Sequence, residues 1–266
     1  MKVLIKGAGD LATGIACRLY ACGYQIIMTE LAVPATVRRT VAFSRAVYEG
    51  EAEVEGVTAL RAEHPREIRK IHEQGKVAVI VDPEVKHLEE YEADVVVDAI
   101  LAKRNTGTSI GDAPLVIGAG PGFEAGKDCH FVIETQRGHY LGRVIRSGLA
   151  IPNTGIPGEV GGYSVERLIR ASAAGSFTAK AAIGDRVEQG DLVALCGSEP
   201  VYARMSGMIR GMLQDGVQVY EGMKCGDIDA RCDKEYCYTI SDKARAVGGG
   251  VLEAIGTWMH APGYDK

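Results

Sequence analysis

The feature that most constrains the fold is a strand, a glycine turn and a helix at the beginning of the chain. Residues 2–6 (KVLIK) form a short apolar run, and the turn Gly7-Ala8-Gly9 follows at once. Apolar residues then recur every four positions, at Leu11, Ile15 and Leu19. This spacing places them on one face of a helix, and a second apolar run follows at residues 24–29. The order strand, turn, helix, strand predicts the start of an α/β sheet.

The turn carries the glycine–alanine form of the dinucleotide-binding fingerprint, Gly7-x-Gly9-x-x-Ala12. Gly7 permits a tight turn, Gly9 lets the backbone approach a pyrophosphate, and Ala12 lets helix and strand pack closely. Glu30 ends the second strand, where an acidic residue can bind a ribose 2′-OH. Asp10 adds a negative charge beside the phosphate position and could serve as a helix cap instead. We therefore expect nucleotide binding here; the alternative is a turn that only connects strand and helix.

Further strands are expected along the first half of the chain, at residues 57–60, 76–81, 94–98 and 114–118. Residues 77–81 and 95–97 are apolar throughout, which is typical of parallel strands buried on both faces. The pattern predicts one open α/β sheet to about residue 120. The fold class expected for this part is a Rossmann-like, doubly wound parallel sheet.

Ligands of such sheets bind outside the carboxyl ends of the strands, so the loops there are candidate binding segments. Lys103 and Arg104 follow one strand and could contact an anion, or they could form a solvated pair of charges. Gly120 and Gly122 follow the next strand. Closely spaced glycines of this kind can form a backbone nest for an anion, or they can make a sharp connection.

Residues 128–139 (DCHFVIETQRGH) place Glu134, Arg137 and His139 at the end of a further strand. Glu134 and His139 are the candidates for acid–base chemistry, and a structural Glu134–Arg137 pair is the alternative. No spacing of histidine, cysteine or acidic residues matches a metal motif, so no metal site is predicted.

An internal repeat with an offset of 32 residues occupies residues 173–229. It aligns Gly175 with Gly207, and it also pairs Gly184 with Gly216, Val187 with Val219 and Gly190 with Gly222. The repeat resembles the barrel-sandwich hybrid of biotinyl and lipoyl carrier domains. Those domains attach their cofactor to a lysine at a hairpin tip, but the tip here reads Gly197-Ser198-Glu199-Pro200. We therefore expect neither biotin nor lipoate. We interpret the module as a rigid addition that packs against the nucleotide-binding domain or docks a partner.

A helix is expected near the C-terminus, capped by Ser241 or Asp242. Gly248, Gly249 and Gly250 lie inside it, and each costs about 0.8–1 kcal/mol relative to alanine in a helix. We expect this segment to pack onto the first domain beside the glycine turn; the alternative is a helix end followed by a second short helix. The expected domains are residues 1–172, 173–232 and 233–266.

Composition excludes several classes of protein. The net charge of −5 argues against a nucleic-acid binder, and no apolar run approaches the roughly 20 residues of a membrane span. Seven cysteines at irregular spacing do not suggest a secreted disulfide framework. The beginning of the chain enters a folded pattern directly, and we expect a cytoplasmic protein.

Several long motifs carry a resemblance across residues 3–255, namely GAGDLATGIACRL, DAILAKRNTGT, GAGPGFEAGKDCHFVIETQRGHYLGRVI, PNTGIPGEVGGYSVERLIRA and ISDKARAVGGGVLEAI. They resemble the YqeB-type accessory proteins of selenium-dependent molybdenum hydroxylase systems. The α/β portion is similar to that of XdhC-type chaperones, which handle the molybdenum cofactor.

The resemblance implies a role in maturing a xanthine-dehydrogenase-like enzyme, with that hydroxylase or its maturation proteins as partners. A nucleotide, an NAD-like dinucleotide or a molybdopterin dinucleotide would then be the ligand. The alternatives are an NAD-dependent oxidoreductase and a non-catalytic interaction scaffold. Whether the chain is an enzyme and whether it forms a homo-oligomer stay open.

Overall fold

A computed structural model describes residues 1–261 and divides the chain into two compact units. The first unit comprises Met1–Ala32, Phe43–Thr154 and Ile240–Lys266, and the second comprises Val33–Ala42 and Gly155–Thr239. Each unit is therefore built from segments that are distant in the sequence. The boundaries expected at residues 172 and 232 remain predictions about independently folding domains.

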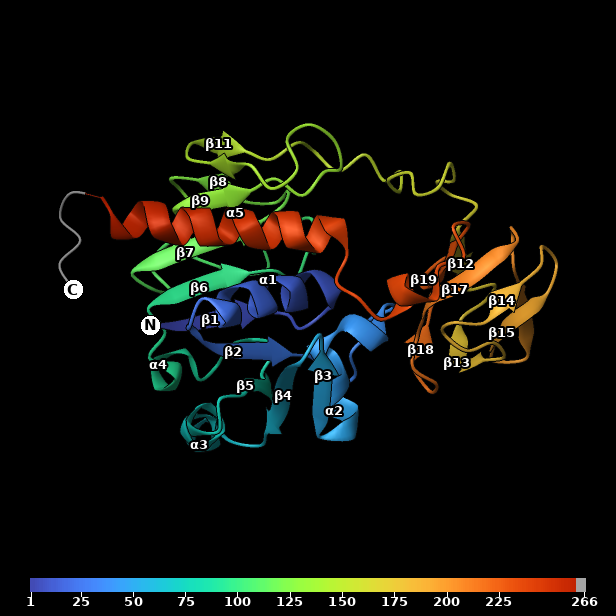
Figure 1. Cartoon of the computed structure of the whole chain (residues 1–266), viewed down its shortest axis with the longest axis horizontal. Coiled ribbons are helices and arrows are strands. Elements are labelled where there is room, and N and C mark those ends of the chain that lie inside the picture. Colours follow the sequence, from blue (N-terminus) through green and yellow to red (C-terminus); the bar gives the residue numbers. More distant parts are fainter. Residues whose placement is uncertain (262–266) are drawn as a thin grey trace. The chain divides into compact units, whose positions relative to one another are not determined.

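The first unit is built on a sheet of nine strands in the order β10-β9-β7-β6-β1-β2-β5-β4-β3 (Figure 1). Its strands are β1 (Lys2–Lys6), β2 (Gln25–Glu30), β3 (Glu51–Val54), β4 (Val57–Ala62), β5 (Val77–Val81), β6 (Val95–Asp98), β7 (Leu115–Ala119), β9 (Phe131–Ile133) and β10 (Val144–Ile145). The seven strands from β9 to β4 are parallel, and the edge strands β3 and β10 pair antiparallel. β8 (Glu124–Ala125) and β11 (Gly148–Leu149) form a separate two-stranded antiparallel sheet.

Two long helices of this unit lie side by side (Figure 1). They are α1 (Asp10–Ala21) and α5 (Asp242–Met259), and the shorter helices of the unit are α2 (Ala46–Glu49), α3 (Ile68–Glu73), α4 (Leu88–Tyr91), η2 (Phe43–Arg45) and η3 (Pro65–Glu67). Among residues 1–261, no helix is both long and apolar enough to cross a bilayer.

The expectation of a Rossmann-like, doubly wound parallel sheet is wrong, because the sheet is mixed. β3 and β4 form an antiparallel hairpin, and β10 returns antiparallel along β9. A doubly wound fold also needs crossover helices on both faces. The connection from β6 to β7, residues 99–114, contains no helix, and α5 from the far end of the chain contacts β7, β9 and β10 instead. The apolar runs predicted strands correctly but could not reveal how the strands pair.

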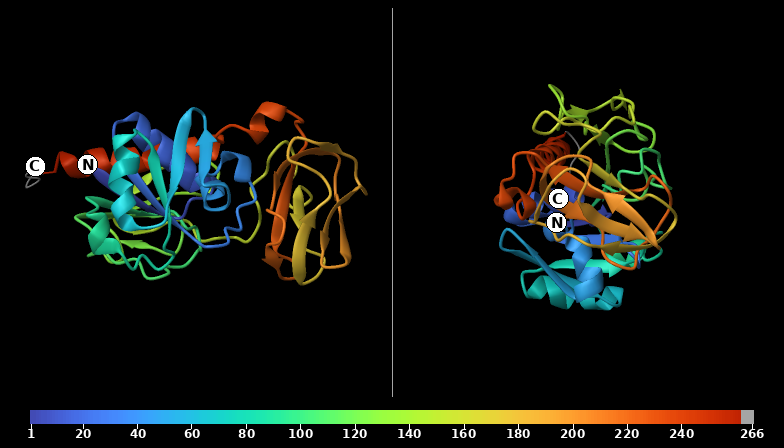
Figure 2. Two further views of the ribbon diagram at one scale, coloured as in Figure 1. Left: turned by 90° about the horizontal axis from the view of Figure 1, so that it is seen from below. Right: turned by 90° about the vertical axis from the view of Figure 1, so that its right-hand side faces the viewer.

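The second unit contains two four-stranded antiparallel sheets, which Figure 2 shows as two layers. One has the order β12-β19-β17-β14 and the other β16-β15-β13-β18. The strands are β12 (Leu168–Arg170), β13 (Gly175–Ala179), β14 (Arg186–Val187), β15 (Leu192–Cys196), β16 (Glu199–Tyr202), β17 (Gly207–Met212), β18 (Gln218–Val219) and β19 (Lys224–Asp229). The unit also holds two 3₁₀ helices, η1 (Arg39–Val41) and η4 (Lys234–Cys237).

The 32-residue repeat has a structural counterpart in this unit. Gly184 and Gly216 both have positive φ angles, 97° and 85°, and so do Gly190 and Gly222, 96° and 80°. Strands of the two halves pair with each other, since β13 pairs with β18 and β14 pairs with β17. The paired glycines thus mark equivalent turns, where a positive φ favours glycine.

The expectation of a small barrel-sandwich domain following a Rossmann sheet is nevertheless also wrong. The unit consists of separate antiparallel sheets that recruit residues outside the repeat. β12 pairs with β19, and the backbone N–H of Met212 donates to the carbonyl of Val37 at 2.8 Å, although Val37 lies far upstream in the sequence. The periodicity of residues 173–229 contained no information about these added segments. The hairpin tip has no lysine, and only Gly197 and Ser198 connect β15 to β16.

A buried charge network joins β17 and β19 to Arg167, the residue before β12. The fully buried Asp227 carboxylate accepts from the guanidinium groups of Arg167 and Arg210, and Lys224 Nζ lies 3.7 Å from it. Asp229, in the same strand as Asp227, accepts from Arg210 at 3.2 Å and from Arg231 at 2.6 Å. Burial acts to raise the pKa of Asp229, but hydrogen bonds from Arg231 and the charge of Arg210 outweigh it and hold that pKa below its usual value.

The glycines of α5 allow close packing inside the first unit. A Cβ added to Gly248 would lie 3.0 Å from the carbonyl oxygen of Gly14 in α1, and one added to Gly250 would lie 2.2 Å from that of Gly142. A Cβ on Gly249 would meet no atom within 4 Å. α5 continues through all three glycines without a break. Gly248 and Gly250 make the close approaches, and Gly249 does not.

Candidate functional site

The carboxyl ends of the parallel strands bring the predicted binding segments to one edge of the sheet. β1, β2, β6, β7 and β9 run in the same direction. The glycine turn, Glu30 and the loops beginning at residues 99, 120 and 134 follow these strands in turn. Segments up to 127 residues apart in the sequence, from Gly7 to Glu134, thus follow strand ends at the same edge.

The glycine turn joins β1 to α1, and only the first of its two glycines is required by the backbone conformation. Gly7 has a φ of 91°, and a Cβ added to it would lie 3.2 Å from the carbonyl oxygen of Ala99, which is a tight contact. Gly9 is the N-cap of α1 with a φ of −67°, so its backbone does not itself require glycine. Ala12 is buried against the sheet, as close packing requires. Since Gly9 has no side chain to cap the helix, the first N–H groups of α1 lack a side-chain cap at that position.

Glu30 lies at the end of β2 beside this turn. Its Oε2 accepts from the backbone N–H of Ala8 at 2.9 Å, and its Oε1 accepts from the N–H of Leu31 at 2.8 Å. Burial raises the pKa of Glu30, and the two backbone hydrogen bonds act against that rise. The carboxylate is thus held in a defined orientation at the glycine turn.

A buried polar trio supports the loop after β6. Lys6 Nζ donates to Thr108 Oγ1 at 2.5 Å, Thr108 Oγ1 donates to Asp98 Oδ2 at 2.6 Å, and the Lys6–Asp98 ion pair measures 3.6 Å. The loop itself carries Lys103, in a left-handed conformation with a φ of 62°, and Arg104. Both side chains are exposed, so the loop presents two cations at the edge of the sheet.

The glycine-rich loop after β7 packs closely against the loops that hold Arg104 and Thr135. Gly122, with a φ of 114°, approaches Arg104 so closely that an added Cβ would lie 2.6 Å from the Arg104 Cα. Gly120, with a φ of 83°, similarly approaches Thr135 Oγ1. Both glycines are therefore required by conformation and by close approach. A role of this loop in binding an anion stays a prediction.

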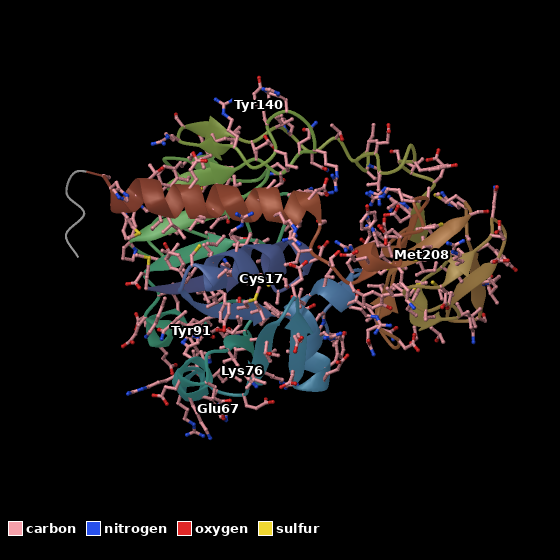
Figure 3. The ribbon with its side chains drawn as sticks, viewed as in Figure 1. Cys17, Glu67, Lys76, Tyr91, Tyr140 and Met208 are labelled. Carbon is pink, nitrogen blue, oxygen red and sulfur yellow. The ribbon has the colours of Figure 1, made fainter. Side chains whose placement is uncertain are left out.

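The acidic and basic residues after β9 do not form the acid–base pair considered from the sequence. Glu134 is buried and accepts from the N–H groups of Gln136 at 2.7 Å and Ile151 at 2.8 Å. His139 is exposed, and its ring packs edge-on against Tyr140, which lies on the outer side of this loop region (Figure 3). Arg137 pairs with Asp242 of α5, at 2.6 and 2.9 Å, instead of with Glu134.

Lys243 is a half-buried lysine near charged residues of this unit that the sequence did not single out. It is the second residue of α5 and is half-buried. The positive charges of Arg137 and Lys103 and the negative charges of Asp10 and Glu134 all act on its ammonium group. Burial is the main cause that lowers the pKa of its ammonium group, and the positive charge of Arg137 adds to this. In the sequence it resembles any solvent-facing lysine in the first turn of a helix.

The cysteine of α1 does not add a nucleophile to this edge. Cys17 is buried in the interior of the unit (Figure 3). Burial raises the pKa of its thiol to about 12. A thiol of that pKa stays protonated at neutral pH and is inert. The edge therefore combines a glycine turn, a helix start and exposed cations with one acidic residue, Asp10, which is the first residue of α1 and not its cap.

Comparison with known proteins connects this chain to one protein by sequence. No family model matches it. The chain is 51% identical over 258 residues to the uncharacterized protein YqeB of Escherichia coli (strain K12), which covers 97% of this chain and 48% of that protein. The chain thus spans about half the length of the curated relative that it matches. This similarity supports the relationship to YqeB that the motifs indicated.

Solved structures are matched only distantly. An aspartoacylase family protein from Mesorhizobium loti MAFF303099 is 12% identical, with a TM-score of 0.27, over 85% of this chain and 84% of that chain. A succinylglutamate desuccinylase/aspartoacylase from Rhodobacter sphaeroides is 15% identical, with a TM-score of 0.28, over 85% of each chain. At this level of similarity the neighbours carry no argument about activity.

Proposed function

We propose that this chain is a binding protein for a phosphate-bearing, nucleotide-like ligand at the carboxyl edge of its parallel strands. The observation that carries the proposal is the turn at Gly7 and Gly9, which leads directly into the start of α1. Backbone N–H groups at a helix start, together with the helix dipole, favour phosphate. Lys103 and Arg104 add positive charge at the same edge.

The biological role that we propose is that of an accessory factor in maturing a selenium-dependent molybdenum hydroxylase. The support is the resemblance of the long motifs together with the similarity to YqeB. In that role the ligand would be a molybdopterin dinucleotide or a related nucleotide, and the partners would be the hydroxylase or its maturation proteins. This part rests on family resemblance, since an α/β sheet alone cannot choose among functions.

An NAD-dependent oxidoreductase is the competing function, and the geometry favours it less. Such an enzyme needs an acid or base placed beside the nicotinamide. Glu134 is committed to two backbone N–H groups, and His139 is exposed against Tyr140. A scaffold without any ligand is the third candidate, and the experiments below separate it from the first.

The proposal predicts that a phosphate-bearing ligand stabilises the wild-type protein but not Gly9→Val. A ligand present at 100 times its dissociation constant should stabilise the fold by about 2.7 kcal/mol. Because Gly9 has a φ of −67°, valine fits the backbone there, but its side chain fills the space that a pyrophosphate needs. Thermal-shift titration with NAD, other dinucleotides and molybdopterin dinucleotides measures the effect.

The control for that experiment is the melting temperature of each protein without ligand, against which its own shift is taken. This separates a loss of binding from a loss of stability. If no compound in the panel raises the melting temperature of the wild-type protein, the turn is only structural and the chain is better described as a scaffold.

Glu30 should make the site prefer a ribose with a free 2′-OH, so that NAD binds more tightly than NADP. The carboxylate beside the turn would accept from the hydroxyl and repel a 2′-phosphate. In Glu30→Gln the repulsion disappears, and the two affinities should approach each other. Calorimetric titration of both nucleotides measures the preference. Equal affinities in the wild-type protein would remove Glu30 from the site.

A further inference from the structure

The loop of residues 99–108 lies directly against the glycine turn. β6 and β1 are neighbours in the sheet, so the loop that follows β6 begins beside the turn that follows β1 (Figure 1). A Cβ added to Gly7 would lie 3.2 Å from the carbonyl oxygen of Ala99 and 3.3 Å from the Cα of Ile100. Because Gly7 puts no side chain between the two backbones, a ligand held at the turn would have this loop beside it.

Two residues of this loop have a backbone conformation that non-glycine residues rarely adopt. Leu101 and Lys103 have φ angles of 60° and 62°. A non-glycine residue in this left-handed region is strained, and the surrounding structure has to hold it there. Such conformations cluster at binding and active sites, where the strain belongs to the shape that a ligand requires. The loop therefore needs a restraint that offsets the strain.

The restraint is a hydroxyl group at the far end of the loop. Thr108 Oγ1 accepts from Lys6 Nζ at 2.5 Å and donates to Asp98 Oδ2 at 2.6 Å, and all three side chains are buried. Lys6 is the last residue of β1, and Asp98 is the last residue of β6. One hydroxyl thus ties the loop to the two strands after which the turn and the loop begin. Moving it away would leave a buried ammonium and a buried carboxylate with one partner fewer, which is unfavourable.

The middle of the loop is held in place as well. Asn105 Oδ1 accepts from the N–H of Thr108 at 2.8 Å, and Asn105 Nδ2 donates to the carbonyl of the same residue at 2.8 Å. The Cα of Arg104 lies so close to Gly122 that an added Cβ would be 2.6 Å away from it. These contacts fix the backbone of the loop, whereas the side chains of Lys103 and Arg104 are exposed.

We propose that the loop of residues 99–108 is a preformed wall of the ligand site and that Thr108 is the residue that positions it. The inference rests on the proposed function, and it names the device that places Lys103 and Arg104 toward the phosphate groups of the ligand. A loop that is already ordered loses little binding free energy to ordering, so the ligand binds more tightly. Thr108 is buried, and it acts through the loop without contacting the ligand itself.

The test measures the dissociation constants of inorganic pyrophosphate and NAD by calorimetry. Thr108→Val keeps the shape of the side chain and removes the hydroxyl, and we expect both constants to rise about fivefold or more. Thr108→Ser keeps the hydroxyl and should restore binding to the level of the wild type. Thr58→Val makes the same change in β4, which three strands separate from β6, and should bind as the wild type does.

Hydrogen exchange without ligand tests the positioning role separately. In Thr108→Val, peptides that cover residues 99–114 should exchange faster than in the wild type, whereas peptides of α5 should exchange at the same rate. Faster exchange in both regions would show that Thr108 only supports the fold of the unit, and the inference would be wrong.

Asn105→Ala is a second variant that decides the question if Thr108→Val does not fold. It removes the hydrogen bonds in the middle of the loop and leaves the buried trio intact. We expect it to raise both dissociation constants and to speed exchange in the same peptides. Binding at the level of the wild type, together with faster exchange of the loop, would contradict the inference.

The outcomes distinguish this inference from the proposed function. If the wild type binds either probe and the loosened variants bind it equally well, the loop is not a wall of the site, while the glycine turn remains a binding site. If the wild type binds neither pyrophosphate nor NAD, the phosphate-binding proposal fails for these probes, and the positioning role of Thr108 is overturned with it.

Discussion

Gly250→Ala should destabilise the first unit by about 1–3 kcal/mol or more, whereas Gly249→Ala, one residue away, should stabilise it by up to about 1 kcal/mol. A Cβ on Gly250 would lie 2.2 Å from the carbonyl oxygen of Gly142 and 2.9 Å from Ile133 Cγ2. Neither neighbour can move without shifting α5 or the loop that contains Gly142. At Gly249 the Cβ meets nothing within 4 Å, so alanine only improves helix propensity.

The fluorescence of Trp258 measures this difference directly. It is the chain's one tryptophan and lies in α5, so urea unfolding followed by its emission reports on the first unit. Both variants are measured without ligand, because the prediction concerns only the free energy of unfolding. If both alanine variants change the free energy of unfolding by the same amount and sign, α5 does not pack on the 142 loop as described.

Asp227→Asn should destabilise the second unit by about 3–5 kcal/mol. The carboxylate is fully buried and holds the guanidinium groups of both Arg167 and Arg210. Removing it takes a fully buried negative charge away from both guanidinium groups, of which Arg210 keeps the Asp229 carboxylate at 3.2 Å. The loss of a buried counter-charge costs far more than the loss of an exposed ion pair. Hydrogen exchange of peptides from β17 and β19, read by mass spectrometry, measures the local loss of protection.

Glu221→Gln is the matched control, because Glu221 is an exposed carboxylate of the same unit. It removes one negative charge without uncovering a buried cation, and we expect a change within about 0.5 kcal/mol. Should Asp227→Asn show the same protection as this control, the network would contribute little and the packing of the strands would carry the stability.

Local pattern predicted much of the edge where the candidate site lies. The strands at residues 2–6, 77–81 and 95–98 and the helix after Gly9 were predicted within a few residues, because each depends on the periodicity of adjacent side chains. Gly7 and Glu30 were predicted for the same reason, since the turn and the end of β2 are close in sequence. The ligand-binding roles of these residues stay predictions.

The fold class was not predicted correctly, because it depends on pairing and not on periodicity. An apolar run such as residues 131–133 does not say which strand will lie beside it or in which direction. The antiparallel pairing of β3 with β4 and of β10 with β9 makes the first sheet mixed where a parallel sheet was expected. The pairing of β12 with β19 adds a strand from outside the repeat to the second unit. The added strands have only two to six residues, too few for a clear pattern.

The sequence by itself determined the local elements of this protein: the strands, the glycine turn, the repeat with its paired glycines and the absence of a lysine at the hairpin tip. Only the tertiary structure decided which distant residues meet. It placed α5 against α1 and joined Arg137 to Asp242 across 105 residues. The physical reason is that local structure follows from neighbours along the chain, whereas a site of this kind is assembled by packing between segments whose separation no sequence pattern records.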